Sequence, residues 1–137
     1  MIKSTELRDG NLFMDSDGTW AYFAGFWVRS DGIILRDSGN NTYKELEVFP
    51  IPLDEGILIK CGFKEDVPNE IGDIYCKHYH NKNNFYISQW VHDKSLVGFE
   101  KKGMWYVGEY IEVPSLHWLQ NWYYFNNGGK ELEINLP

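Results

Sequence analysis

The sequence predicts an α+β fold: a strand-rich, curved antiparallel sheet or small open barrel with one or two short helices packed on it. Three observations predict it. Short runs of aromatic and β-branched residues recur along the chain, Gly and Asn turn signals separate them, and two segments carry helix start and stop signals. A length of 137 residues fits a single domain over residues 1–137.

The turn signals divide the chain into strands, because Gly and Asn adopt the positive φ angles that tight turns need. Asp15-Ser16-Asp17-Gly18 is one such signal; it resembles the start of a calcium loop but lacks the later ligands, so we expect a hairpin turn. Gly25 predicts a bulge within its strand, and residues 64–73 read as a surface loop. The expected strands are 11–14, 19–29, 32–36, 42–49, 73–80, 84–91, 95–100, 104–111 and 131–135.

The first expected helix follows Ile51-Pro52-Leu53. Asp54 is a favourable N-cap, Glu55 suits the positive end of the helix dipole, and Gly62 is a natural stop. About two turns fit between these signals.

The second expected helix starts near Pro114, which suits a first-turn position, and ends at Gly128 or Gly129. At 100° per residue it has two apolar stripes instead of the usual one. The helix is therefore either sandwiched between other elements or offers one face to a partner. One stripe holds Leu116, Leu119 and Tyr123, the opposite one holds Trp118, Trp122 and Phe125, and a polar strip between them holds His117, Gln120, Asn121 and Tyr124.

Charge and aromatic content restrict the class of partner. The net charge of −7 argues against general nucleic-acid binding and permits a basic protein partner. Aromatic residues make up 17% of the chain, more than we expect a core of this size to hide, so some should meet a partner. The predicted binding residues are Trp118, Trp122, Phe125, Trp105, Tyr110 and Tyr79.

A metal or thiol chemistry is a weaker interpretation. Cys76, His78 and His80 would share one face of a strand, and His92 or His117 could add a fourth zinc ligand. The spacing matches no standard zinc signature, so structural roles are favoured. Cys61 falls at a helix C-terminus, where the dipole disfavours a thiolate. We expect no metal, no cofactor and no enzymatic activity.

Three pieces of the chain resemble a known family. They are Glu6-Leu7-Arg8-Asp9-Gly10-Asn11-Leu12, then 51–63 with Ile-Pro-Leu-Asp-Glu and Cys-Gly-Phe, and finally 116–124 followed by Lys130-Glu131-Leu132-Glu133-Ile134. They are similar to the ELRxGN, IPLTxxxLxxCGF and LHxLQNLYFxLTGxEL motifs of small uncharacterised proteins from Bacteroidetes phages, prophages and mobile elements. The pieces follow in order and cover about a third of the chain.

The departures from those motifs point to the second helix. The resemblance implies Gln at the position of Trp118 and Leu at that of Trp122, so the helix has gained indole rings where the family has a polar and a smaller side chain. We therefore expect a contact surface particular to this chain. Residues 64–112 match only loosely, as a variable, function-bearing region would.

The resemblance implies a phage setting, and with it a function by binding. We expect a phage accessory protein in the host cytoplasm, without a signal peptide or membrane segment, that counters defence by blocking a host immune protein or by sequestering a small nucleotide signal. Nucleotide capture would need a local basic cluster. The alternatives are a homo-oligomeric structural or assembly protein, and a small Cys/His hydrolase or metalloenzyme. The candidate basic cluster is Lys77, Lys82, Lys94, Lys101 and Lys102.

Overall fold

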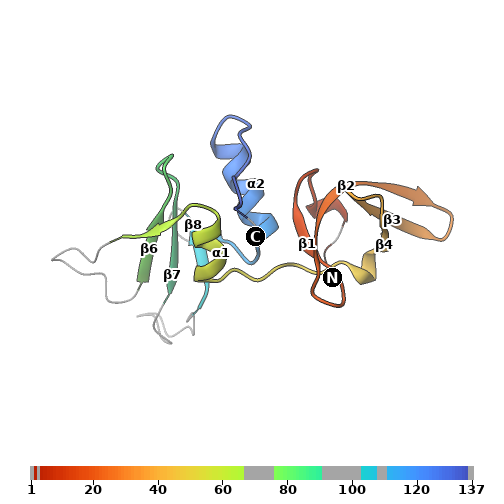
Figure 1. Cartoon of the computed structure of the whole chain (residues 1–137), viewed down its shortest axis with the longest axis horizontal. Helices are drawn as coiled ribbons and strands as arrows, with labels where there is room; N and C mark the ends of the chain where they lie inside the picture. The colour runs from red at the N-terminus through yellow and green to blue at the C-terminus, as the bar shows by residue number, and fades with distance from the viewer. Residues whose placement is uncertain (1, 3, 67–75, 91–102, 108–110, 136–137) are drawn as a thin grey trace. The chain divides into compact units, whose positions relative to one another are not determined.

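The computed structural model describes residues 2, 4–66, 76–90, 103–107 and 111–135. It has an α+β fold with two antiparallel sheets and two short helices (Figure 1), which confirms the predicted class. The chain forms two compact units. The first comprises Met1–Pro52 with Ser115–Lys130, and the second comprises Leu53–Pro114 with Glu131–Pro137. That the two act as one domain stays a prediction.

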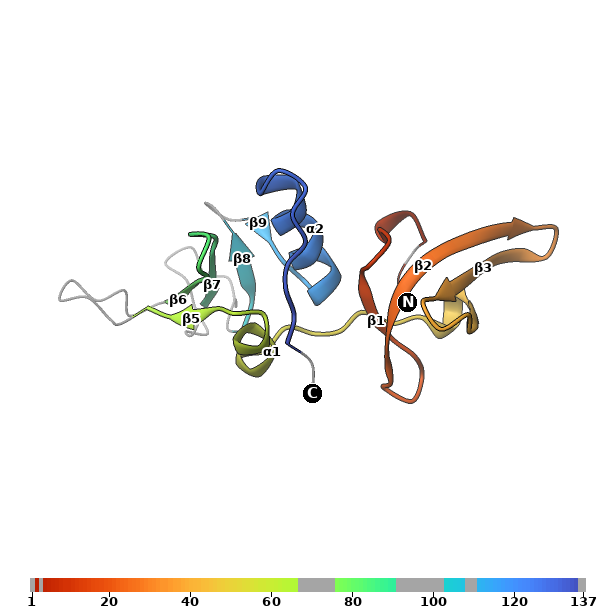
Figure 2. The same ribbon diagram turned by 45° about the horizontal axis from the view of Figure 1, so that its top comes forward.

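The first unit is built on a curled four-stranded sheet of order β1-β2-β3-β4. Phe49 returns to β1 and bridges Met14, and Ile2 N donates to Val48 O at 3.0 Å, so the sheet is partly closed. The strongly bent β2–β3 hairpin is clear in Figure 2. Before helix α2, the first unit contains η1 Ser4–Glu6, β1 Leu12–Met14, β2 Trp20–Arg29, β3 Gly32–Asp37, β4 Thr42–Lys44 and η2 Glu45–Glu47.

Local signals shape this sheet as expected. The Asp15 carboxylate accepts from the backbone N–H groups of Asp17 and Thr19, both at 2.9 Å, which makes the predicted hairpin turn. The register of β2 against β3 shifts between Phe23 and Phe26, and Gly25 lies there with φ +117°, so the predicted bulge is confirmed. The core inside the sheet contains Ile2, Phe13, Phe23, Leu35 and Val48.

Helix α2, Leu116–Asn126, completes the first unit and contacts β1. Its N-cap residue is Ser115, so Pro114 precedes the helix and does not lie in its first turn as predicted. Beyond the helix Gly128 and Gly129 both have positive φ, which agrees with the predicted stop.

The second unit combines helix α1 with a five-stranded sheet of order β5-β6-β7-β8-β9. The predicted N-cap of α1 is confirmed, since Asp54 Oδ1 accepts from Ile57 N at 2.7 Å. Gly62 follows the helix with φ +83°. The elements are α1 Glu55–Lys60, β5 Lys64–Glu65, β6 Cys76–His80, β7 Tyr86–Trp90, β8 Trp105–Val107 and β9 Ile111–Glu112.

Several strand predictions need correction. The expected strand 42–49 breaks after Lys44 into η2, because the Glu47 carboxylate accepts from Lys44 N at 3.0 Å and favours a tight turn over a ladder. Residues 131–135 form no strand, although Leu132 is buried there. The expected strand 104–111 is divided between β8 and β9.

Other boundaries also moved. The predicted surface loop begins with β5, whose Lys64 and Glu65 pair with His80 and Tyr79. The first strand, expected at 11–14, runs from Leu12 to Met14. The expected strand 95–100 lies outside the described residues.

Candidate functional site: an aromatic hollow beside helix α2

Two faces of α2 have different surroundings. The stripe of Leu116, Leu119 and Tyr123 is buried. On the opposite face the Trp118 side chain is 39% exposed and that of Phe125 is 73% exposed. A second apolar stripe that is open to solvent is unusual for a short helix.

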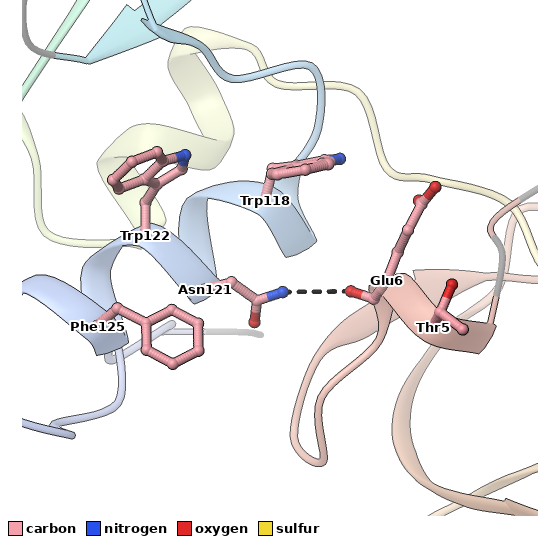
Figure 3. Close-up of a pocket in the computed structure, with 6 residues that line it drawn as sticks. All are labelled: Thr5, Glu6, Trp118, Asn121, Trp122 and Phe125. Carbon is pink, nitrogen blue, oxygen red and sulfur yellow. Dashed lines mark hydrogen bonds between the residues drawn. The ribbon is translucent and has the colours of Figure 1, made fainter.

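The exposed face forms one wall of a hollow of about 360 Å³. Figure 3 shows the rings of Trp118, Trp122 and Phe125 along the helix, with η1 of the same unit opposite them and Asn121 between. We call this site the aromatic hollow. It is lined by Thr5, Glu6, Trp118, Asn121, Trp122 and Phe125. Its volume lies at the lower end of the range for small-ligand pockets.

The N-terminal segment reaches the helix through a turn that the sequence encodes. Gly10 has φ +90°, a value that side chains disfavour. Asn11 Oδ1 accepts from Arg8 N at 2.7 Å, and Arg8 O accepts from Asn11 N at 2.9 Å. These bonds hold residues 8–11 in a turn that presents its polar groups to α2.

Gln120 joins the helix to this turn on the buried side. Its Oε1 accepts from Leu12 N at 2.8 Å, and its Nε2 donates to Gly10 O at 3.1 Å. Within the predicted polar strip Gln120 and His117 are buried, whereas Asn121 and Tyr124 are half-buried. Gln120 therefore satisfies backbone groups of a distant segment and does not face solvent.

Asn121 makes a second junction beside the hollow. Its Oδ1 accepts from Asn11 Nδ2 at 2.9 Å and from Arg8 Nε at 3.2 Å, and its Nδ2 donates to Glu6 O at 3.3 Å, the contact drawn in Figure 3. The Arg8 guanidinium lies 3.9 Å from the centre of the Tyr124 ring. Two pieces of sequence more than 100 residues apart are therefore hydrogen-bonded to one another, and the hollow lies at their junction.

His117 is buried behind Glu6. Its Nδ1 is hydrogen-bonded to Ser115 Oγ at 2.9 Å, and its Nε2 lies 3.5 Å from Glu6 Oε2. Burial lowers the pKa of His117, and the nearby Glu6 carboxylate opposes that shift. The imidazole is accordingly neutral at neutral pH and contributes no positive charge beside Glu6.

The other predicted binding residues lie elsewhere. Tyr79 and Trp105 are buried in the second unit, with ring centroids 5.5 Å apart, and Trp105 Nε1 donates to Leu53 O at 3.1 Å. Burial raises the pKa of the Tyr79 hydroxyl to about 12, with the charges of Glu55 and Glu65 adding to the shift. Their burial gives no support to a binding role, which stays a prediction, and Tyr110 lies outside the described residues.

Cys76, His78 and His80 do not gather around a common point. Cys76 Sγ shares a hydrogen bond with Tyr106 Oη at 2.7 Å, His78 Nδ1 is hydrogen-bonded to Ser88 Oγ at 2.7 Å, and His80 Nδ1 contacts Asp66 Oδ1. Within the described ranges no cluster of three His, Cys, Asp or Glu side chains is placed to hold a metal ion. His92 lies outside those ranges.

Cys61 lies just past helix α1, as predicted. It is buried, and burial raises the pKa of its thiol to about 12. A thiol with that pKa is protonated at neutral pH and is a poor nucleophile.

A second exposed apolar surface escaped the sequence prediction. Beyond Phe23 the described residues of β2 pair only with β3, and Phe26, Trp27 and Val28 are exposed there. We call Phe26–Val28 the hairpin patch. Three consecutive apolar residues place side chains on both faces of a strand, and this run was the signal that could have revealed an exposed ribbon.

Comparison of the chain with protein-family models, curated proteins and solved structures gives no match. None of the helices in the described part of the chain combines the length and apolar character needed to cross a bilayer.

Proposed function

We propose that this chain is a non-enzymatic phage accessory protein that binds a host immune protein through the aromatic hollow and so counters host defence. The observation that carries the binding role is the row of Trp118, Trp122 and Phe125 along the hollow, on a helix whose other apolar stripe is buried. In this row Trp118 and Phe125 are exposed and Trp122 is half-buried. The phage setting is supported by the motifs at residues 6–11, 51–63 and 116–124.

The construction of the hollow suits protein recognition. Large aromatic side chains that line a concave site dominate the binding energy of many interfaces. The hydrogen bonds of Gln120 and Asn121 hold the helix against the N-terminal turn, so the rings are positioned before a partner arrives. Preorganisation of this kind reduces the entropy lost on binding.

A nucleotide signal fits the hollow less well than a protein does. None of its six described lining residues is basic, and Glu6 contributes a carboxylate that repels phosphate. The described lysines of the expected basic cluster, Lys77 and Lys82, belong to the second unit, where Lys82 Nζ lies 3.2 Å from Glu133 Oε2. Lys94, Lys101 and Lys102 lie outside the described residues.

The test is plaque formation on a panel of Bacteroidetes hosts that carry defined defence systems. Expression of the wild-type chain should restore plaques on at least one host, and Phe125→Ser should abolish that restoration. Leu46→Ser is the matched control. Leu46 is 72% exposed against 73% for Phe125, belongs to the same unit and does not line the hollow.

Two results would contradict the proposal. One is unchanged plating on every host when the wild-type chain is expressed. The other is restoration that Phe125→Ser leaves intact while the variant remains folded by circular dichroism.

Homo-oligomeric assembly is a second candidate, favoured by the hairpin patch. Val28 is 76% exposed near the end of β2, and beyond Phe23 the edge of β2 that faces away from β3 makes no described ladder bond. Such an unpaired edge readily pairs with another chain. Sedimentation at several concentrations distinguishes the candidates. A dimer that Val28→Lys dissociates supports assembly through this edge, and a monomer at every concentration rules it out.

A further inference from the structure

We propose that the aromatic hollow binds a cationic side chain, an arginine or lysine from a basic segment of the partner. The inference rests on the proposed binding function and specifies the chemistry of that same site. It follows from the kinds of groups that line the hollow and from the charges around it.

The rings provide the first part of the argument. Indole faces are the best cation-binding surfaces among side chains, and a cation held within about 6 Å of a ring centre is attracted by its quadrupole. Two indoles and a phenyl ring, those of Trp118, Trp122 and Phe125, lie along one side of the hollow in Figure 3. An uncharged apolar group would also fit these rings, so they do not decide the charge of the ligand by themselves.

Glu6 decides the sign of that charge. Its side chain extends from η1 across the hollow from the helix, on the Trp118 side in Figure 3, and is 35% exposed. The neighbouring His117 ring is neutral at neutral pH because burial lowers its pKa, so it does not cancel the carboxylate. A carboxylate opposite aromatic rings favours a cation and disfavours a phosphate or a carboxylate ligand.

Besides Glu6, the lining has polar side chains at Thr5 and Asn121, and the amide of Asn121 already has hydrogen-bond partners. Asn121 Oδ1 accepts two hydrogen bonds and one N–H of its Nδ2 donates to Glu6 O, so its neighbours hold this amide in place and one N–H is left to donate. Arg8 also approaches α2, but its guanidinium stacks on Tyr124, which does not line the hollow. Arg8 demonstrates that a ring of this helix can hold a guanidinium.

The charge of the whole chain acts in the same direction. At −7 it attracts a basic partner at long range and speeds the encounter. A volume of about 360 Å³ accommodates an arginine or lysine side chain together with part of its flanking peptide.

The experiment titrates the full-length protein with three small probes at constant ionic strength. The first probe is N-acetyl-arginine methylamide. The second is the corresponding citrulline compound, which has nearly the same shape without the charge, and the third is adenosine monophosphate. The readout is the indole N–H signals of Trp118 and Trp122 in ¹⁵N spectra, assigned with Trp118→Phe and Trp122→Phe. We expect the arginine probe to shift both signals and to bind about five- to tenfold more tightly than the citrulline probe.

Three variants test the source of that preference. Glu6→Gln should weaken arginine binding about fivefold, and Asp31→Asn, which removes an exposed charge of the same unit outside the hollow, should change it less than about twofold. Phe125→Leu keeps an apolar side chain but removes a ring, and it should also weaken the arginine probe. Thermal unfolding confirms that each variant is folded.

Equal binding of the arginine and citrulline probes would overturn the inference, as would the absence of any shift with arginine at tens of millimolar. Tighter binding of adenosine monophosphate, strengthened by Glu6→Gln, would also overturn it and would assign the hollow to an anionic ligand. These failures are separable from failure of the proposed function. If Phe125→Ser still abolishes plaque restoration while the probes show no charge preference, the binding role stands and only the cationic ligand is wrong.

Discussion

The two faces of helix α2 both carry apolar side chains, but they differ in burial. On the docked face Leu119 is fully buried and Gln120 makes two hydrogen bonds to the N-terminal segment. On the other face Phe125 is 73% exposed above the aromatic hollow. Two stripes of similar apolar content on one helix therefore differ in burial, because a neighbouring segment covers one stripe and leaves the other exposed.

The largest effect should come from Leu119→Ala on the docked face. Loss of a fully buried leucine leaves a cavity and should reduce the free energy of unfolding by about 2–5 kcal/mol. Urea unfolding followed by circular dichroism measures the change. Trp118→Ala on the neighbouring open face should cost clearly less, although Trp118 is the larger side chain, and an equal loss would break the distinction between the faces.

Gln120→Leu should have the next largest effect. It keeps the approximate size of the side chain but leaves the buried Leu12 N–H and the Gly10 carbonyl without this partner, which should cost about 1–3 kcal/mol. The same unfolding experiment applies. Asn126→Ala is the control, because the Asn126 side chain donates to Trp122 O of its own helix in an exposed position. Its loss should change stability by less than about 0.5 kcal/mol. Similar losses for both would show that the junction to the N-terminal turn adds nothing.

His117 should make stability depend on pH to a smaller extent. Because its folded-state pKa is lowered from 6.5, the unfolded state takes up the proton first as the pH falls. The stabilising contribution is therefore complete above about pH 6.5 and is lost as the pH falls towards the folded pKa. Melting temperatures between pH 8 and pH 5 should fall less for His117→Gln than for the wild type.

A companion variant gives the same test from the other side. Glu6 opposes the lowering of the His117 pKa, so this pKa should fall further in Glu6→Gln. The melting temperature of Glu6→Gln should therefore decline more steeply at acid pH than that of the wild type. An unchanged decline in both variants would show that other groups control the acid limb.

The smallest effect on stability should be that of Phe125→Ser. An exposed ring that supports no core should be replaceable within about 0.5 kcal/mol. Binding, measured with the arginine probe, should nevertheless weaken, because a wall of the hollow is lost. A large loss of stability would mean that this face is also structural, and the division between the two faces would fail.

Signals within a few residues predicted the local structure well. The Asp54 cap, the glycine stops, the Asp15 turn and the bulge at Gly25 all depend on hydrogen bonds or φ angles of adjacent residues. The errors arose where strand-like composition competes with another local structure or with packing. Residues 42–49 have strand-like composition, yet the bond from Lys44 N to Glu47 forms a tight turn instead, and the apolar Leu132 is buried without joining a ladder.

The candidate site was predicted in part. Helical periodicity separated Trp118, Trp122 and Phe125 from the docked residues, and these three do line one hollow. Periodicity could not show that Glu6 stands opposite them, that His117 and Gln120 are buried, or that Tyr79 and Trp105 pack inside the other unit. Each of those outcomes depends on which distant segment lies beside the residue.

By itself the sequence determined the caps, turns and two-sided pattern of the last helix, because such features are governed by neighbours along the backbone. Only the tertiary structure decided that Glu6, Arg8 and Asn11 meet Asn121, and thus that the exposed rings face a carboxylate. The physical reason is that a hydrogen bond across more than 100 residues forms only when the folded chain brings its partners together, and no local pattern encodes that approach.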